Sequence, residues 1–258
     1  MIGIIGGSGL YAIEGVIIKK RSRLKTPYGS PSDAFVIGEL QGRKIAFLPR
    51  HGSKHSVPPH RINYRANIWG MKELGVQRII SVSATGGISS RMKPGTIAVL
   101  DQIIDLTKVR SSTFYEGEAV HIDFTEPYCP EMRRALLEAS GAAGIGVMKS
   151  GTYLCTEGPR LETRSEIGYF SRIGADVVGM TGMPEASLAR EAEICYAGVA
   201  VVTNYAAGLT GDKLTASEVI KTMAEATGHL KILVKEALGR IPVRRKCLCK
   251  EALREARI

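Results

Sequence analysis

Three short stretches of the chain combine glycine, basic or hydroxyl residues, and each directly follows an apolar, β-branched run. The residues in them that could do chemistry are Ser8 in a glycine turn, Arg50 with His51, and Ser83 with Ala84. Backbone N–H groups in a glycine turn, a guanidinium fork and hydroxyl groups donate hydrogen bonds of the kind that holds a phosphate. The sequence therefore predicts an anion-binding site, although each stretch alone is also typical of an ordinary turn or a basic surface loop.

The glycine turn does not match the fingerprints of the common nucleotide cofactors. Residues 6–9 read Gly-Gly-Ser-Gly, which is not the G-x-G-x-x-G pattern, and no lysine follows where a P-loop requires one. The acidic residue that accompanies the dinucleotide fingerprint is not evident either. The sequence therefore gives little support to a dinucleotide-binding oxidoreductase or an ATP-binding enzyme.

The five cysteines do not form a recognisable framework. An odd count at wide spacing is not typical of a secreted disulfide protein, and a single Cys-x-Cys lacks the second pair or the histidine that a zinc site needs. We interpret Cys129, Cys155 and Cys195 as structural thiols. Cys247 and Cys249 could form a labile disulfide in a mobile tail, of the kind that intracellular proteins of hyperthermophiles tolerate.

The elements that position these groups follow from hydrophobic periodicity. Short apolar runs predict strands at residues 2–5, 34–37, 44–48, 78–82, 96–104, 175–178 and 196–202. Helical spacing predicts helices at residues 64–73, 131–143, 184–193 and 217–238, the last with Ser217 as its N-cap. This alternation, with no linker and no internal repeat, indicates a single α/β domain with a central mixed sheet flanked by helices. Residues 110–130 form the longest predicted loop, and loops of that length are often functional.

The charge of the chain suggests an anionic partner. The formal net charge is +10, but seven basic and two acidic residues fall between Arg240 and the end, so half of the excess lies in a short segment. Aromatic residues make up 6%, too few for an extended base-stacking surface. We therefore expect a small anionic substrate and a solvated basic tail rather than nucleic-acid binding. No apolar run reaches the length of a membrane span and the start is not a signal peptide, so we expect a cytoplasmic protein.

Further motifs complete an ordered set that spans most of the chain. They are residues 156–163 (TEGPRLET), 174–181 (GADVVGMT) and 202–206 (VTNYA). This set resembles the purine nucleoside phosphorylases, in particular their methylthioadenosine phosphorylase branch, from residue 2 to about residue 238. The resemblance implies a phosphorylase domain over residues 1–240, with residues 241–258 as a basic C-terminal tail that carries the Cys-x-Cys.

The resemblance also implies the reaction and its ligands. Phosphate attacks C1′ of a purine nucleoside and releases the base and ribose 1-phosphate, with phosphate as co-substrate and with no metal or organic cofactor. By the resemblance, the phosphate ligands are Ser8, Arg50, His51, Ser83, Ala84 (through its backbone) and Thr181, and Met180 contacts the ribose. His121 matches a residue that relatives supply to a neighbouring subunit's sugar pocket, which implies a homotrimer or a homohexamer.

The expected base pocket departs from the adenine-specific branch at three residues, Glu162, Asn204 and Ala206. Tyr205 also belongs to the expected substrate-binding set. A 6-oxopurine carries an N1–H donor that a carboxylate accepts, whereas adenine presents a lone pair there. We expect Glu162 to accept N1–H and the amide of Asn204 to meet O6 and N7, where charge develops as the bond breaks; these two are the predicted catalytic residues. Alternatively, Glu162 is a partly solvated carboxylate at a helix start.

The sugar pocket is predicted to be apolar on its 5′ side. Inosine-specific relatives place a histidine where this chain has Ala216, and Val219 and Ile220 follow on the next turn. A small apolar lining favours a methylthio group over a hydroxyl that needs a partner, although Val219 and Ile220 could simply be the core face of the helix. The sequence therefore predicts phosphorolysis of S-methyl-5′-thioinosine. A broad inosine and guanosine phosphorylase is the alternative, followed by a methylthioadenosine phosphorylase.

Overall fold

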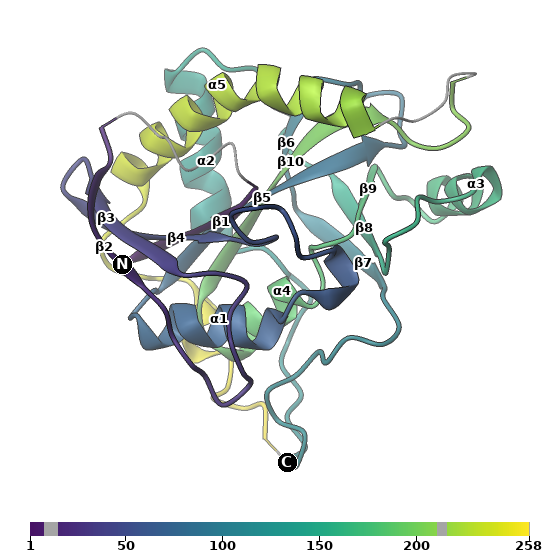
Figure 1. Ribbon diagram of the computed structural model, residues 1–258. Helices are drawn as coiled ribbons and strands as arrows, with labels where there is room; N and C mark the ends of the chain where they lie inside the picture. Colours follow the sequence, from purple (N-terminus) through teal and green to yellow (C-terminus); the bar gives the residue numbers. More distant parts are fainter. Residues whose placement is uncertain (8–14, 211–215, 258) are drawn as a thin grey trace.

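A ten-stranded mixed β-sheet forms the centre of the molecule (Figure 1). A computed structural model describes residues 1–7, 15–210 and 216–257, with the side chains of residues 216–218 excepted. The described strands are β1 (Ile2–Gly6), β2 (Ile17–Ser22), β3 (Phe35–Leu40), β4 (Arg43–Pro49), β5 (Arg78–Gly87), β6 (Ile97–Val99), β7 (Gln102–Leu106), β8 (Thr152–Thr156), β9 (Val177–Gly179) and β10 (Cys195–Tyr205). The described α-helices are α1 (Tyr64–Glu73), α2 (Pro130–Ala142), α3 (Arg164–Arg172), α4 (Glu185–Glu191) and α5 (Ala216–Arg240), and short 3-10 helices cover Pro59–Arg61 and Leu248–Glu251.

A parallel group at the centre of the sheet brings several loops to one edge. Strands β4, β1, β5 and β10 lie side by side and run in the same direction. The carboxyl ends of parallel strands in an open α/β sheet are the usual place for a ligand. The long strand β5 keeps β10 on one side, but on the other side it pairs first with β1 and then, through Gly86 and Gly87, antiparallel with β9. Strand β9 in turn runs parallel to β8.

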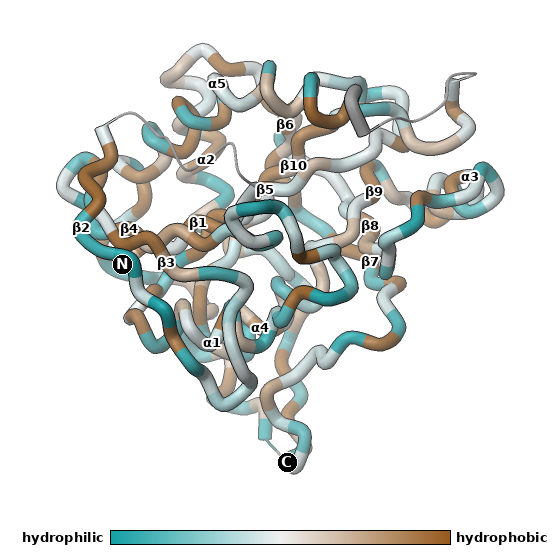
Figure 2. The backbone as a smooth tube through the Cα atoms, viewed as in Figure 1, coloured by the Kyte–Doolittle hydropathy of each residue, from teal (hydrophilic) through white to brown (hydrophobic). Residues whose placement is uncertain are grey.

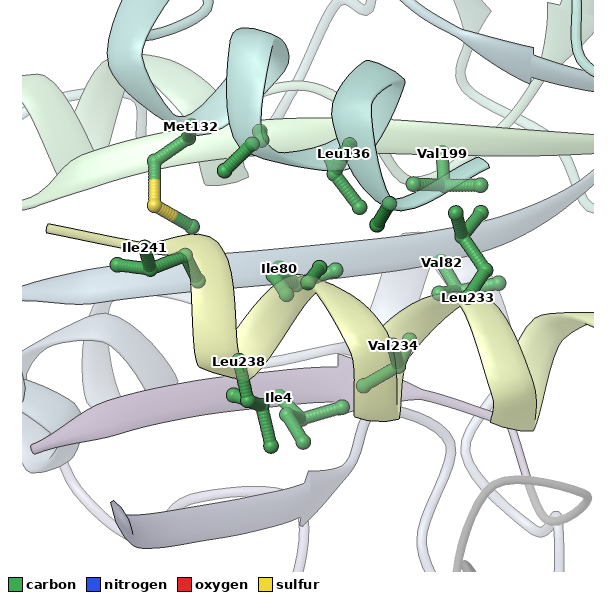
Figure 3. Packing of buried hydrophobic residues seen from close by; sticks show 14 of the residues in the cluster. Ile4, Ile80, Val82, Met132, Leu136, Val199, Leu233, Val234, Leu238 and Ile241 are labelled. Carbon is green, nitrogen blue, oxygen red and sulfur yellow. The ribbon is translucent and has the colours of Figure 1, made fainter. Parts of the chain in front are cut away.

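Helices cover both faces of this sheet, so the core has two layers. Consecutive residues of a strand point to opposite faces, and Ile80 packs with Leu136 of α2 and Leu233 of α5, whereas Ile79 packs with the α1 and α4 side (Figures 1 and 3). Figure 2 shows the hydrophobic strands enclosed by more polar loops and helix faces. Each fully buried Leu or Ile contributes about 1.5–3 kcal/mol, so both faces of the sheet stabilise it.

The predicted α/β architecture is confirmed, with several differences in its elements. Strand β2 was not predicted because it is an edge strand whose residues are almost all exposed, Ile17 by 65%. Strand β8 and helix α3 were also missed, and the strand predicted over residues 96–104 is two strands, β6 and β7, with different partners. Of the described helices, none is long and apolar enough to cross a membrane.

The C-terminal segment is not the solvated, mobile tail that the charge pattern suggested. Ile241, Cys247 and Cys249 are buried in the core cluster that also contains α2 and α5 side chains. The backbone N–H of Lys246 donates to Glu131 Oε1 at 2.7 Å, and the guanidinium of Arg43 donates to the carbonyl of Ile241 at 3.1 Å. The sequence could not show this packing, because hydrogen-bond partners such as Glu131 and Arg43 lie 115 and 198 residues earlier.

Candidate active site

The three anion-binding stretches predicted from the sequence meet at the carboxyl edge of the parallel strands. Gly6 ends β1, and its carbonyl accepts a hydrogen bond from the N–H of Arg50 at 3.2 Å. Arg50 directly follows β4, and its Nη1 donates to the carbonyl of Val82 in β5 at 2.9 Å. The strand order therefore places Gly6, Arg50 and Val82 side by side, whereas Ser8 lies outside the described residues.

The guanidinium of Arg50 is buried against the carboxylate of Glu185, the first residue of α4. Nε donates to Oε2 at 2.8 Å and Nη2 to Oε1 at 2.9 Å, and the two side chains are 2% and 0% exposed. Nη2 also donates to Ser81 Oγ at 2.6 Å, and Tyr196 Oη donates to Glu185 at 2.8 Å. Burial opposes ionisation of Glu185, but the charge of Arg50 and these hydrogen bonds outweigh it and lower the pKa of the carboxyl.

This pairing changes what Arg50 can offer to a phosphate. A guanidinium has five N–H donors, and the bonds to Glu185, Ser81 and Val82 use Nε–H, both N–H groups of Nη2 and one of Nη1. Among its described contacts, one N–H of Nη1 therefore remains for an anion. The pairing of Glu185 with Arg50 was not predicted from the sequence, because nothing local to either residue links positions 135 residues apart.

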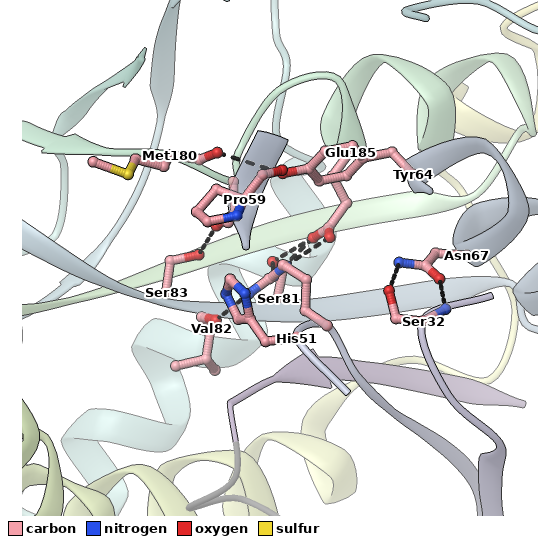
Figure 4. A network of polar contacts seen from close by, with 12 residues as sticks. Ser32, His51, Pro59, Tyr64, Asn67, Ser81, Val82, Ser83, Met180 and Glu185 are labelled. Carbon is pink, nitrogen blue, oxygen red and sulfur yellow. Dashed lines mark hydrogen bonds and ion pairs between the residues drawn. The ribbon is translucent and has the colours of Figure 1, made fainter. Parts of the chain in front are cut away.

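His51 is held as a neutral imidazole beside Arg50. Figure 4 shows His51 near Ser81 and Val82. Its Nδ1 lies 2.9 Å from the carbonyl of Val57. A carbonyl can only accept, so Nδ1 carries the proton and Nε2 is left with its lone pair. Burial, followed by the charge of Arg50, lowers the pKa of His51 to about 4. The ring therefore carries no charge at neutral pH until an anion or an acid reaches it.

Two hydroxyl groups complete the predicted phosphate side. Ser83 Oγ and Thr181 Oγ1 lie 3.1 Å apart, from β5 and from the turn after β9 (Figure 4). Ser83 is half-buried and Thr181 is buried, while Ala84 is exposed. Ser83 directly follows Val82, whose carbonyl accepts from Arg50. The two hydroxyl groups therefore form a compact polar surface with little net charge beside the guanidinium.

Glu162 lies on the base side of the predicted pocket, just before α3. Thr156 Oγ1, at the end of β8, donates to Glu162 Oε1 at 2.9 Å. The helix that follows begins with a capping box, in which Thr163 and Glu166 exchange side-chain and backbone hydrogen bonds. Burial of the half-buried carboxyl raises the pKa of Glu162. A carboxylate has lone pairs on two oxygens, so Glu162 can hold Thr156 and still accept from a ligand.

Asn204 lies near the end of β10, where its amide orientation is fixed by a backbone carbonyl. Nδ2 donates to the carbonyl of Tyr205 at 2.8 Å, and Oδ1 accepts from Thr203 Oγ1 at 2.9 Å. The reverse orientation would place two acceptors against each other. Asn204 pairs in register with Gly86, and a Cβ on Gly86 would lie 3.5 Å from Nδ2. The amide therefore lies in van der Waals range of the Gly86 position, next to the buried Ala206.

Arg110 ties both sides of the site together, and sequence reasoning gave it no role. Its side chain is 3% exposed and pairs with Glu157 at 3.1 Å. Nη1 donates to the carbonyls of Met180 and Met183, at 2.8 and 2.6 Å, and Nη2 donates to the carbonyl of Glu157 at 2.7 Å. Nη1 also reaches Tyr64 Oη at 3.1 Å. One side chain thus fixes the turn that bears Thr181 and the loop that leads to Glu162.

The residues predicted for the sugar side have fewer described contacts with the groups above. Met180 is half-buried, and a Cβ on Gly158 would meet its sulfur at 2.5 Å, so this side chain lies against the loop before Glu162. Val219 is half-buried and Ile220 is 69% exposed. The side chains of Ala216 and of Ser217, the predicted N-cap, are not among the side chains that the structure describes. His121 is exposed, and its N–H donates to the carbonyl of Ala256 at 2.7 Å. That loop lies with the C-terminus, away from the ends of β5 and β10 (Figure 1).

Known proteins share both the sequence and the fold. The family described as the Phosphorylase superfamily matches residues 1–239. The probable 6-oxopurine nucleoside phosphorylase of Thermococcus kodakarensis is 52% identical, over 99% of this chain and 98% of that protein. The probable S-methyl-5′-thioinosine phosphorylase of Thermodesulfovibrio yellowstonii is 53% identical, over 99% and 96%.

The same relationship is seen among solved structures. A methylthioadenosine phosphorylase from an antarctic soil metagenomic library is 40% identical, with a TM-score of 0.93, and the alignment covers 100% of this chain and 92% of that one. Identity above half over nearly the full length of two relatives, together with the shared fold, carries the assignment. The chain belongs to the phosphorylase superfamily, among the nucleoside phosphorylases that these relatives represent.

Proposed function

We propose that the protein catalyses phosphorolysis of 6-oxopurine nucleosides, with S-methyl-5′-thioinosine as the preferred substrate. The products are hypoxanthine and 5-methylthioribose 1-phosphate. The observation that supports this most directly is the half-buried carboxylate of Glu162, with one oxygen held by Thr156 and lone pairs left to accept from a base. Among relatives, those named for 6-oxopurine and thioinosine substrates are about half identical to this chain.

The base is distinguished by which ring atoms donate. Hypoxanthine presents N1–H to the Glu162 carboxylate, whereas adenine presents a lone pair, which leaves acceptor against acceptor. The second N–H of the Asn204 amide is free of the Tyr205 bond and can donate to O6 or N7. Sites built on such polar pairs can discriminate by about 10⁴-fold, because the wrong base leaves buried groups unpaired.

The phosphate side supplies positioning rather than covalent chemistry. Arg50, Ser83 and Thr181 donate hydrogen bonds to the phosphate below C1′, and the Nε2 lone pair of neutral His51 accepts from its P–OH group. The bond to the base breaks through an oxocarbenium-like state. Negative charge that develops on the purine is stabilised by the free N–H of the Asn204 amide at O6 or N7, while Glu162 accepts N1–H and orients the base. Inorganic phosphate is the co-substrate, and we propose no metal or organic cofactor at the reacting atoms.

The methylthio preference rests on the 5′ side of the sugar. The chain has Ala216 and Val219 where a hydroxyl-binding side chain would be needed, and Val219 is half-buried. Each buried methylene-sized group contributes about 0.8 kcal/mol, so a methylthio group gains more here than a hydroxyl without a partner. The exposure of Ile220 favours the broader inosine and guanosine activity as the second candidate.

The test is a comparison of kcat/KM for five nucleosides: methylthioinosine, inosine, guanosine, adenosine and methylthioadenosine. We expect methylthioinosine to be turned over fastest and both adenine nucleosides to be poor. Equal rates for methylthioinosine and inosine would select the broader activity, and a preference for methylthioadenosine would overturn the base assignment. Base release that continues at full rate without phosphate would mean hydrolysis, and would exclude phosphorolysis.

Exchange of the base-reading groups tests their roles directly. Glu162→Ser with Asn204→Asp should move the preference towards methylthioadenosine, because acceptor and donor are exchanged at the 6-position. Either change alone should mainly lower activity, since one group of a buried pair is left unsatisfied. Glu166→Gln is the matched control, because Glu166 lies on the same segment but pairs with Arg160. A double variant that keeps the wild-type preference would show that these residues do not read the base.

We also propose that the enzyme works as a homotrimer or homohexamer. His121 is exposed in a loop that, by resemblance, reaches a neighbouring subunit's sugar. Light scattering at assay concentration should give the mass of three or six chains. A mass near that of one 27.8 kDa chain would contradict the proposal.

A further inference from the structure

Four of the five cysteines converge on one point of the core, away from the proposed active site. This cysteine quartet consists of Cys129, Cys195, Cys247 and Cys249. All four residues are buried, and their sulfur atoms lie within 4.8 Å of one another. The group belongs to the same buried cluster as Met132 and Ile241 (Figure 3). The Cys-x-Cys that lacked partners in the sequence therefore has two, supplied by distant elements.

We propose that the cysteine quartet binds one divalent metal ion of the zinc class through four thiolates. Zinc–thiolate bonds of about 2.3 Å in a tetrahedron place neighbouring sulfurs about 3.8 Å apart. The sulfurs of Cys195 and Cys247 are 3.3 Å apart, and no pair in the quartet exceeds 4.8 Å. Small side-chain rotations thus convert the observed arrangement into a four-coordinate site with no open position, as in structural zinc sites.

The backbone fixes the four ligands before any metal arrives. Cys129 is the N-cap of α2, and its N–H donates to the carbonyl of Tyr196 at 2.8 Å. Cys195 is the first residue of β10, in register with Arg78 of β5. Cys247 is the N-cap of the short 3-10 helix that contains Cys249. Regular elements therefore hold the sulfurs, and little chain entropy is lost when the ion binds.

The surrounding charge fits an ion held by thiolates. Four thiolates and a divalent cation carry a net charge of −2, which a purely apolar core would disfavour. The segment around the Cys-x-Cys reads RRKCLCK, so Arg244, Arg245, Lys246 and Lys250 flank the two ligands. Four basic residues beside two buried cysteines have no evident role in the proposed catalysis. Lys250 pairs with Glu251 at 3.4 Å, so Arg244, Arg245 and Lys246 are the residues that offer positive charge to a tetrathiolate site.

The site would join three regions that are remote in sequence. It ties the C-terminal segment to the start of α2 and to the start of β10. The end of that segment pairs with the long loop, since Val120 and Arg257 form a β-bridge and the N–H of His121 donates to Ala256. Metal binding at the quartet therefore stabilises the C-terminal segment and, through it, the loop that carries His121.

Metal analysis of the whole chain tests the proposal. The protein is produced without a histidine tag, purified under reducing conditions without chelator, and supplied with Zn²⁺ before dialysis. We expect about one zinc ion per chain and four thiols protected from alkylation until a chelator is added. With Co²⁺ in place of Zn²⁺, we expect the visible absorption bands of a tetrahedral tetrathiolate site.

A matched pair of variants locates the ion. Cys247→Ser with Cys249→Ser should reduce bound metal at least about tenfold, as two of four thiolate ligands are lost. Cys155→Ser should leave the metal content unchanged, because Cys155 is equally buried but lies outside the quartet. Absence of bound metal in the reduced, zinc-supplied wild type would overturn the proposal. So would denatured aerobic protein with one free thiol, because the quartet would then be two disulfides.

Discussion

The buried pair of Arg50 and Glu185 makes a prediction that separates stability from phosphate binding. Arg50→Met leaves a carboxylate that is 0% exposed without its cation, and removal of one partner of such a pair costs about 3–5 kcal/mol. Adding Glu185→Gln removes the orphaned charge and keeps an acceptor for Ser81 and Tyr196. We expect the double variant to be more stable than the sum of the single losses by about 2 kcal/mol.

Phosphate binding should behave differently from stability in these variants. One charge-assisted hydrogen bond is worth about 1.5–3 kcal/mol, so the phosphate KM should rise about 10- to 150-fold in both Arg50→Met and the double variant. Stability is measured by urea unfolding in phosphate-free buffer, since a bound ligand would itself stabilise the folded state. Lys54→Met, which removes an exposed cation from the same loop, is the control.

Two results would refute this reasoning. Single losses that simply add in the double variant would show that the pair is not coupled. A double variant that regains both stability and the wild-type phosphate KM would show that Arg50 serves only Glu185, and the phosphate role would be lost.

Three further predictions concern His51, Arg110 and Thr163 in the candidate active site. The lowered pKa of His51, about 4 against an ordinary value near 6.5, means that the unfolded chain takes up the proton first, so stability present above pH 6.5 is lost as the pH falls towards 4. Between pH 7 and pH 5 this group should lower the unfolding free energy by about 2 kcal/mol, and urea titrations of His51→Gln should lack that part of the decrease. Arg110→Lys should raise the nucleoside KM about tenfold and lower the melting temperature, since one ammonium cannot replace a planar fork that reaches several carbonyls; unchanged kinetics in a destabilised variant would limit Arg110 to a structural role. Thr163→Ala should cost about 1 kcal/mol through loss of the α3 cap, and a raised KM with little change in kcat would show that the cap also positions Glu162.

The sequence predicted best those elements whose own residues carry the signal. The helix predicted at residues 64–73 has those bounds in the structure, because its apolar spacing and its Asn63 cap are local. The strands of the parallel group were also found, since short β-branched runs between glycines are buried on both faces. The exposed edge strand β2 has no such pattern, and the capping box that starts α3 was a readable signal that was passed over.

Contacts between distant residues were beyond local patterns. The motifs placed Arg50 just after β4 and Asn204 near the end of β10, and the strand order brought them beside Ser83, which lies inside β5 because that strand continues to Gly87. Nothing in the neighbourhood of Arg110 predicts that its guanidinium reaches two separate loops and helix α1. Nothing in the Cys-x-Cys predicts Cys129 and Cys195 beside it. Such convergence depends on the topology of the whole sheet, which periodicity does not determine.

The proposed phosphate side is close to electrically neutral before its ligand arrives, and this suits a reaction in which the bound phosphate must act as the nucleophile. Glu185 balances Arg50, and burial keeps His51 uncharged. A strongly cationic site would bind phosphate tightly in the ground state and lower its power to attack, which gains nothing for the chemical step. Oriented N–H and O–H dipoles instead hold the anion in place at little cost in nucleophilicity. The carboxylate that stabilises Arg50 in the fold therefore also moderates the charge that the phosphate meets.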